Sequence, residues 1–210
     1  MLKVAHEEAD TRTLLHAVNS SCDTVVVSAR DTDVFIMLLS HLNKMRCKEL
    51  WMMAGTSKKR RFIPIHDIHC KLSPEVLSSL LAFHAISGCD TTSYIRGHTK
   101  RSMWNTFIES TNLLRNLGRG PLTQETINDA ERFFCHVYKV NADSVDDARR
   151  LLFSKTSQPE CLPPTSDALQ QHIKRSHYQA TVWEQACCST PDLLNAEHGV
   201  GKRTPVIHLS

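Results

Sequence analysis

Acidic residues occur as two closely spaced pairs in the first part of the chain, and a single one follows later. They are Glu8, Asp10, Asp31, Asp33 and Asp90. Carboxylate oxygens are preferred ligands of Mg²⁺ and Mn²⁺, and several carboxylates at one place repel each other unless a cation lies between them. Such a cation can activate water and stabilise the leaving oxygen of a phosphodiester. The pattern predicts a Mg²⁺ or Mn²⁺ site for phosphodiester hydrolysis.

A basic segment follows Asp90. Its sequence, Ile-Arg-Gly-His-Thr-Lys-Arg, places the relevant residues at Arg96, Gly97, Lys100 and Arg101. Backbone N–H groups at a helix N-terminus, flanked by Lys and Arg, form an anion site, which predicts contacts with the DNA backbone. Residues 58–120 hold 10 Lys and Arg against 4 Asp and Glu, an excess that favours a polyanionic partner. The alternative is a set of solvated basic side chains at the start of a helix.

The elements that position the acids are predicted to follow an α/β pattern. Residues 24–29 and 49–54 are apolar, partly β-branched runs typical of buried strands, and residues 60–65 are a third strand candidate. A helix of about eleven residues is predicted to begin at Asp31. This order favours an α/β fold with a parallel sheet and crossover helices. Such sheets bind ligands at the carboxyl ends of their strands, where Asp31 and Asp33 are expected.

Each of these acids also has a purely structural interpretation. The pair at residues 8–10 suits the first turn of a helix over residues 6–20, where the helix dipole favours acidic side chains. The pair at residues 31–33 suits the N-cap and first turn of the next helix. Asp90 suits a turn after a buried helix over residues 74–87. The spacing alone favours these structural roles. Support for a shared metal site must therefore come from the order of the acidic motifs along the chain.

The loop Gly-Arg-Gly-Pro-Leu-Thr marks the best candidate for a domain boundary. Residues 1–118 are expected to form the α/β core, residues 119–195 a helical extension, and residues 196–210 a loose tail. Helical stretches are expected in the extension at residues 124–140, 144–154 and 166–186. The chain is therefore expected to consist of one core with a helical appendage.

The order of the acidic motifs resembles the second half of the flap endonuclease/XPG-type 5′ nuclease domain, a PIN-like fold. Glu-Ala-Asp opens a helix, Asp-Thr-Asp follows a hydrophobic strand 23 residues later, and Gly-Cys-Asp follows a long buried helix 57 residues after that. The resemblance implies an incomplete PIN-like parallel sheet with crossover helices. It also implies that the five acids are catalytic metal ligands for hydrolysis of DNA, with Mg²⁺ or Mn²⁺ as cofactor.

The segment after Asp90 resembles the family's helix–two-turn–helix, which grips duplex backbone. Here the frame has one residue fewer and lacks the second glycine. The resemblance implies that Arg96, Gly97, Lys100 and Arg101 bind DNA. Because the second glycine is missing, the resemblance does not extend to a close approach of the backbone to the nucleic acid.

A complete nuclease of this family begins with a strand that carries an aspartate, followed by a helical arch, and both would precede Met1. We therefore expect a fragment of a longer protein or a remnant, with hydrolysis weak or lost in this chain. The motifs Glu-Glu-Ala-Asp-Thr, Gly-Cys-Asp-Thr-Thr-Ser and Gln-His-Ile-Lys-Arg also resemble uncharacterised, transposon-associated animal proteins. The alternative function is a non-catalytic nucleic-acid or protein interaction module derived from a transposable element.

The amino-acid composition indicates which cellular compartment suits the protein. The 8 cysteines form no Cys-x-x-Cys pair and no secretory signal is recognisable, which favours reduced thiols in an intracellular protein without a membrane span. The run Ser-Lys-Lys-Arg-Arg at residues 57–61 is interpreted as a nuclear-import patch, a phosphate contact or a solvated turn. His66, His69 and Cys70 suggest zinc, but the missing fourth ligand favours structural roles.

Overall fold

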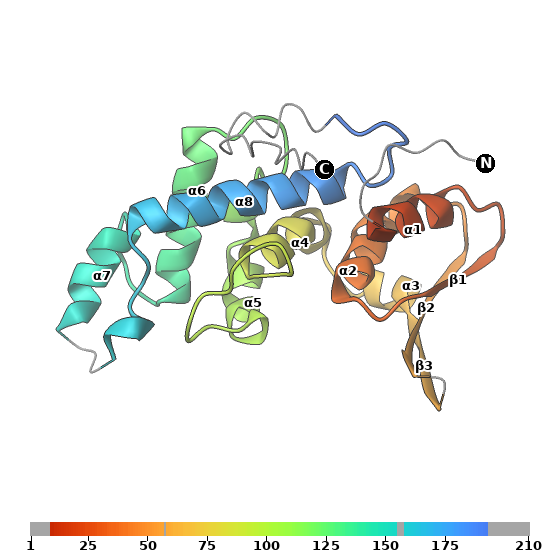
Figure 1. The fold of residues 1–210 in the computed structure, drawn as a ribbon, viewed down its shortest axis with the longest axis horizontal. Coiled ribbons are helices and arrows are strands. Elements are labelled where there is room, and N and C mark those ends of the chain that lie inside the picture. The colour runs from red at the N-terminus through yellow and green to blue at the C-terminus, as the bar shows by residue number, and fades with distance from the viewer. Residues whose placement is uncertain (1–8, 57, 155–157, 193–210) are drawn as a thin grey trace, which may run out of the picture.

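The computed structural model describes residues 9–56, 58–154 and 158–192. A small β-sheet with its neighbouring helices lies at one end of the molecule, and a larger helical body lies at the other (Figure 1). The α-helices are α1 Ala9–Val18, α2 Thr32–His41, α3 Ile65–His69, α4 Pro74–Ile86, α5 Lys100–Glu109, α6 Gln124–Val137, α7 Val145–Phe153 and α8 Ser166–Glu184. Short 3-10 helices lie at Leu42–Lys44, Thr111–Leu114 and Pro159–Cys161.

The described residues form a sheet of three strands in the order β1 Thr24–Ser28, β2 Glu49–Thr56 and β3 Lys59–Pro64. β1 and β2 are parallel, as predicted, and α2 lies in the crossover between them. β3 is antiparallel to β2, so the prediction of a wholly parallel sheet is wrong. The turn between Thr56 and Lys59 is far shorter than the crossover of about a dozen residues that a parallel pair needs. The fold is α/β with a mixed, open sheet.

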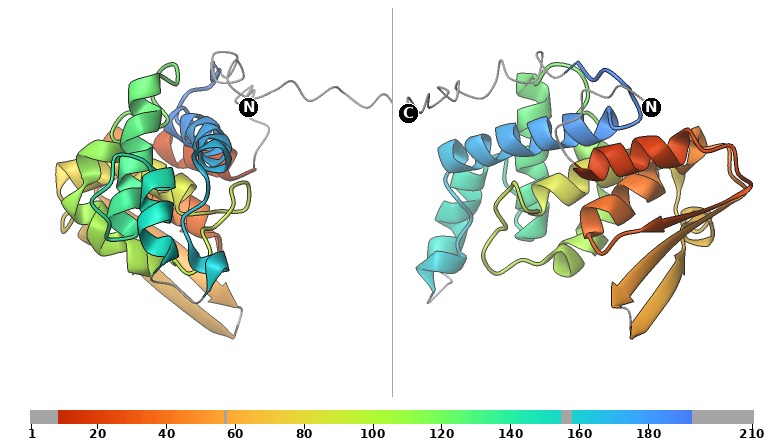
Figure 2. Two further views of the ribbon diagram at one scale, coloured as in Figure 1. Left: turned by 90° about the vertical axis from the view of Figure 1, so that its left-hand side faces the viewer. Right: turned by 45° about the vertical axis from the view of Figure 1, so that its right-hand side comes forward.

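The two faces of this sheet differ in their environment. Val27, Leu50 and Met52 point to the inner face and are at least 94% buried in the core beside α1, α2 and α3. Side chains alternate between the faces of a strand, so their neighbours point outward. On this outer face Val26 is 51% exposed and Phe62 is 55% exposed. The views in Figure 2 show the β2–β3 hairpin extending beyond the helices that cover the inner face.

Side-chain caps fix the starts of the helices near the sheet. Asp31 lies outside the helical conformation and its carboxylate accepts a hydrogen bond from the backbone N–H of Asp33 at 2.9 Å. Ser73 caps α4 through Val76 N–H at 3.3 Å, with Pro74 in the first turn. Both helix starts were predicted from these residue types, and the structure confirms them.

One hydrophobic cluster connects the sheet region to the helical body. It extends from Leu14 to Ala186 and includes residues of α2, α4, α6 and α8. α8 lies along α4 (Figure 1). Residues on both sides of position 118 therefore contribute to the same core. No helix in the described ranges combines the length and apolarity that crossing a membrane requires.

Gly118→Ala is expected to destabilise the contact between α8 and the loop that contains residues 118–120. Gly118 has φ +88°, and a Cβ there would lie 2.5 Å from the Cβ of Ala180. Gly120 has φ +61° but nothing within 4 Å of such a Cβ, so Gly120→Ala is a control for backbone strain alone. Gly118→Ala should lower the free energy of unfolding by about 1 kcal/mol more than Gly120→Ala in denaturant titrations. Equal losses in the free energy of unfolding would show that the loop can move away from Ala180 without destabilising the protein.

Candidate functional site

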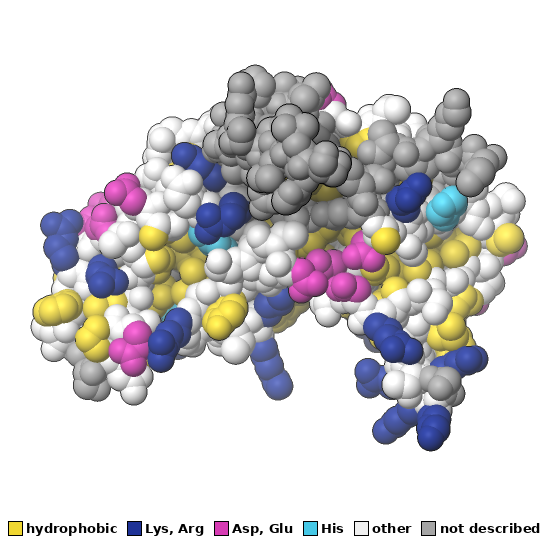
Figure 3. Space-filling model, in the orientation of Figure 1, with side chains coloured by type: hydrophobic (Ala, Val, Ile, Leu, Met, Phe, Trp, Pro, Cys, Tyr) yellow, Lys and Arg dark blue, Asp and Glu magenta, His cyan; other side chains and the backbone are white. Residues whose placement is uncertain are grey.

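The structure brings four of the five predicted acids into one neighbourhood. Asp10 lies in the first turn of α1, Asp31 and Asp33 begin α2 directly after β1, and Asp90 follows α4. Partial burial raises the pKa of Asp10, and the negative charges of Asp31, Asp33 and Asp90 raise it further. Acidic side chains gather between the helical body and the sheet in Figure 3. Glu8, the fifth predicted acid, lies outside the described residues.

A cleft opens at the carboxyl end of β1, beside these acids. Its volume is about 760 Å³, and Asp31 and Asp90 line it. Arg30 and Arg60 line the same cleft, so cationic and anionic side chains border one space. The remaining lining residues come from the ends of β1 and β2 and from the start of α2: Ser28, Ala29, Thr32, Met53, Ala54, Gly55 and Thr56. This cleft is the candidate functional site, at the sheet position where α/β folds bind ligands.

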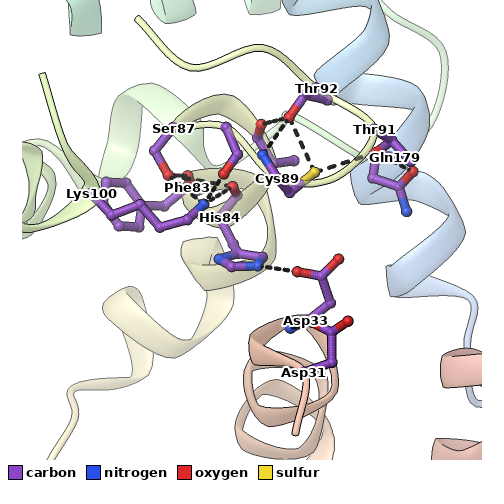
Figure 4. Close-up of polar contacts among 12 residues, drawn as sticks. Asp31, Asp33, Phe83, His84, Ser87, Cys89, Thr91, Thr92, Lys100 and Gln179 are labelled. Carbon is purple, nitrogen blue, oxygen red and sulfur yellow. Dashed lines mark hydrogen bonds and ion pairs between the residues drawn. The ribbon is translucent and has the colours of Figure 1, made fainter. Parts of the chain in front are cut away.

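Asp33 pairs with a buried histidine that was not among the residues predicted from the sequence. His84 Nε2 lies 2.7 Å from Asp33 Oδ1, and the two side chains are 3% and 17% exposed (Figure 4). The His84 ring also lies against Trp183, with ring centroids 5.4 Å apart. The only signal in the sequence was a histidine within the apolar helix α4, one turn before Gly88. The pair holds one oxygen of Asp33 in a fixed place.

A second, smaller cavity lies beyond the Asp33–His84 pair. It has a volume of about 420 Å³ and is lined by His84, Lys100, Arg101 and Trp104, together with residues of α2 and α4. Thr32 lines both this cavity and the cleft. The start of α2 therefore lies between the two spaces.

Lys100 does not project into solvent as the predicted DNA contact would. Its ammonium donates hydrogen bonds to the carbonyl of His84 at 2.8 Å, to Ser87 Oγ at 3.2 Å and to the carbonyl of Gly88 (Figure 4). Burial lowers its pKa, although electrostatic interactions with Cys89 and Asp33 act in the opposite direction. The carbonyls at the end of α4 lack helical partners, which explains why they attract a cation. In this structure Lys100 therefore caps the C-terminal end of α4.

The other predicted DNA contacts lie in the segment before and at the start of α5. Arg96 is exposed and lies 3.8 Å from Glu160, and Gly97 has φ +82°, which suits glycine. Arg101 is exposed at the rim of the second cavity. The helix itself begins with a capping box between Thr99 and Ser102. The cationic side chains of this segment differ in environment, because Lys100 points to the end of α4 whereas Arg96 and Arg101 are exposed.

The turn that carries Asp90 is fixed by hydrogen bonds on both sides. Thr92 Oγ1 donates to the carbonyl of Ala85 at 2.6 Å and accepts from the Cys89 N–H at 3.0 Å. Thr91 Oγ1 donates to Gln179 Oε1 on α8 at 2.8 Å (Figure 4). The Gly-Cys-Asp-Thr-Thr segment therefore anchors Asp90 between α4 and α8, which gives the threonines a role in positioning the acid.

The carboxylate donors suit a hard divalent cation, and the crowding of negative charge at Asp10 supports such a fit. Within residues 9–56, 58–154 and 158–192, however, no three His, Cys, Asp or Glu side chains are grouped closely enough to hold a metal ion. One oxygen of Asp33 is occupied by His84, and one of Asp31 caps α2. The acids thus share a neighbourhood without forming a closed coordination shell.

The zinc alternative at residues 66–70 has a structural explanation. His66 Nδ1 lies 3.0 Å from the carbonyl of Leu50, and His69 Nδ1 lies 2.9 Å from that of Leu39. These bonds attach α3 to β2 and α2, as the structural interpretation predicts.

Comparison with protein-family models, curated proteins and solved structures finds no match to this chain.

Proposed function

We propose that the protein belongs to a PIN-like, flap-nuclease-related lineage and that its cleft carries out metal-dependent hydrolysis of phosphodiester bonds in DNA, weakly in this chain alone. The observation that carries the proposal is the convergence of four carboxylates at the carboxyl end of β1, although they are spread over residues 10–90. Convergence of this kind makes electrostatic repulsion inside the fold, and a bound cation relieves it. The order of the acidic motifs gives independent support.

Asp10, Asp31, Asp33 and Asp90 would hold Mg²⁺ or Mn²⁺ once their side chains move closer together than they are in this structure, and the bound ion would supply an activated water and charge stabilisation at the phosphate. The chain's own side chains have separate tasks. His84 orients Asp33 through the 2.7 Å contact. Arg30 and Arg60, which line the same cleft, are placed to bind a phosphodiester beside the acids.

The test is cleavage of single-stranded and flap DNA in Mn²⁺ by the wild type and by Asp31→Asn/Asp33→Asn. Asparagine still caps a helix and still accepts from His84, so this variant should fold. We expect at least about tenfold slower cleavage and loss of the thermal stabilisation that Mn²⁺ gives the wild type. Asp143→Asn/Asp167→Asn, which changes two exposed acids elsewhere, is the matched control. Equal cleavage by all three proteins would exclude hydrolysis at this cleft.

A second candidate is a non-catalytic nucleic-acid interaction module derived from a transposable element. The observation that favours it is the engagement of Asp33 by His84 and of Asp31 by the α2 cap, which reduces the number of free metal ligands. This candidate predicts DNA binding that weakens with salt and is indifferent to divalent cations. Binding that strengthens in Mn²⁺ only when Asp31 and Asp33 are intact would favour the nuclease instead.

A further inference from the structure

The β2–β3 hairpin carries a concentrated positive charge away from the rest of the molecule. Lys58, Lys59, Arg60 and Arg61 follow one another at its end, and all four are exposed. Basic side chains surround the end of this hairpin in Figure 3. Within the described residues none of the four forms an ion pair, whereas other cations such as Lys48 and Arg119 do. The charge is therefore available to a partner.

The outer face of the sheet adds an apolar and aromatic surface to this charge. Phe62 is 55% exposed and lies opposite Met53, and Val26 is 51% exposed and lies opposite Trp51. Trp51 is itself partly exposed. Side chains two residues apart on a strand share a face, so Arg60 lies on the same face as Phe62. A cation and an aromatic ring are thus neighbours on the outer face of the sheet, where Phe62 is exposed.

This surface leads into the acidic cleft. Arg60, Met53 and Gly55 belong to the hairpin, and they line the cleft together with Asp31 and Asp90. The aromatic face, the basic hairpin and the acids are consequently parts of one continuous surface. A chain that lies along the hairpin therefore meets the carboxylates at its end.

We infer that the outer face of the sheet and the β2–β3 hairpin bind single-stranded nucleic acid and guide it into the cleft. Bases stack on Phe62, and phosphates contact Arg60 on the same face, while Lys58, Lys59 and Arg61 at the end of the hairpin add positive potential. A duplex satisfies the cations but keeps its bases inside its own stack, so it gains nothing from Phe62. The binding itself is independent of metal, but the delivery of the strand to the carboxylates rests on the proposed function.

The test measures the affinity of the full chain for fluorescein-labelled oligothymidylate and for a duplex by anisotropy, in EDTA. Phe62→Ala should weaken single-strand binding about tenfold and leave duplex binding unchanged. Phe153→Ala is the matched control, since Phe153 is 67% exposed on α7, far along the chain from the hairpin. Arg60→Gln/Arg61→Gln should weaken both and reduce the salt slope by about 0.7 for each phosphate of the single strand that the variant no longer neutralises.

Three results would overturn the inference: no single-strand binding, equal effects of Phe62→Ala and Phe153→Ala, or displacement of the oligonucleotide from the wild type only by an acidic peptide. The last would assign the surface to a protein partner. Because EDTA removes metal, a positive result stands even if no DNA is cleaved, in which case only the proposed hydrolysis fails. Cleavage in Mn²⁺ with unaltered binding by Phe62→Ala would preserve the hydrolysis and exclude this guide surface.

Discussion

Lowering the pH from 6.5 towards 4 is expected to remove roughly 3 kcal/mol of stability through His41 alone. His41 is 2% exposed, and its Nε2 lies 2.8 Å from the carbonyl of Trp183. Burial lowers its pKa from 6.5 to about 4, with help from the charge of Lys44 and against the hydrogen bond to Trp183. This hydrogen bond links the last residue of α2 to the last turn of α8, so protonation of His41 acts on the contact between these two helices.

The direction follows from proton uptake. In the unfolded chain His41 binds its proton near pH 6.5, whereas in the folded protein it does so only near pH 4. Between these values the unfolded state holds more protons, so the free energy of unfolding falls as the pH falls. Burial also lowers the pKa of His172 and His177, and both add to the same loss. The raised pKa of Asp10 acts the other way, because protonation of its carboxyl relieves repulsion.

The measurement is urea unfolding at a series of pH values between 7 and 4 for the wild type and for His41→Gln. Glutamine can keep a donor to Trp183 but has no proton to gain. The variant should show a shallower pH dependence, while His16→Gln, at an exposed position of α1, should match the wild type. Parallel curves for all three proteins would contradict the assignment of the acid sensitivity to His41.

His177 illustrates why buried histidines make this fold acid-sensitive. Its Nδ1 accepts from the backbone N–H of Gly118 at 3.0 Å, and its Nε2 donates to the carbonyl of Gly120 at 3.1 Å. Only the neutral ring can accept at Nδ1, so a second proton removes the acceptor of Gly118. The loop at residues 118–120 is thereby attached to α8 by a neutral imidazole.

Local patterns in the sequence predicted the elements well. The run Thr-Val-Val-Val-Ser and the cap residues Asp31 and Ser73 are sufficient for a strand and two helix starts, because they act through neighbouring backbone groups. The antiparallel direction of β3 could have been predicted from the short turn before it. A Pro- and Gly-containing loop does not reveal whether the helices after it share a core with those before it, and here they do.

The candidate site was predicted only in part, because its remaining features depend on side-chain direction. The clustering of Asp10, Asp31, Asp33 and Asp90 follows from the placement of elements around β1. The Asp33–His84 contact spans 51 residues, and no local pattern specifies it. The inward direction of Lys100 likewise depends on where α4 ends relative to α5.

Lys100→Met is expected to lower the free energy of unfolding by about 2 to 3 kcal/mol, since a charged donor is removed from the carbonyls at the end of α4. Arg101→Met, at the exposed neighbouring position, should leave stability unchanged. In DNA binding, Lys100→Met should keep the wild-type salt slope, because its ammonium is bound to the carbonyls at the end of α4. Denaturant titration and anisotropy give both quantities.

This pair of variants decides between two roles for the basic segment after Asp90. A stable Lys100→Met protein with weakened DNA binding would mean that the ammonium faces phosphate, as the sequence predicted. A destabilised protein with an unchanged salt slope would mean that Lys100 holds the end of α4, and with it the turn that carries Asp90. In that case the cations that meet a nucleic acid are those of the hairpin and of the cleft, Arg30 and Arg60, because these line the space that the carboxylates share.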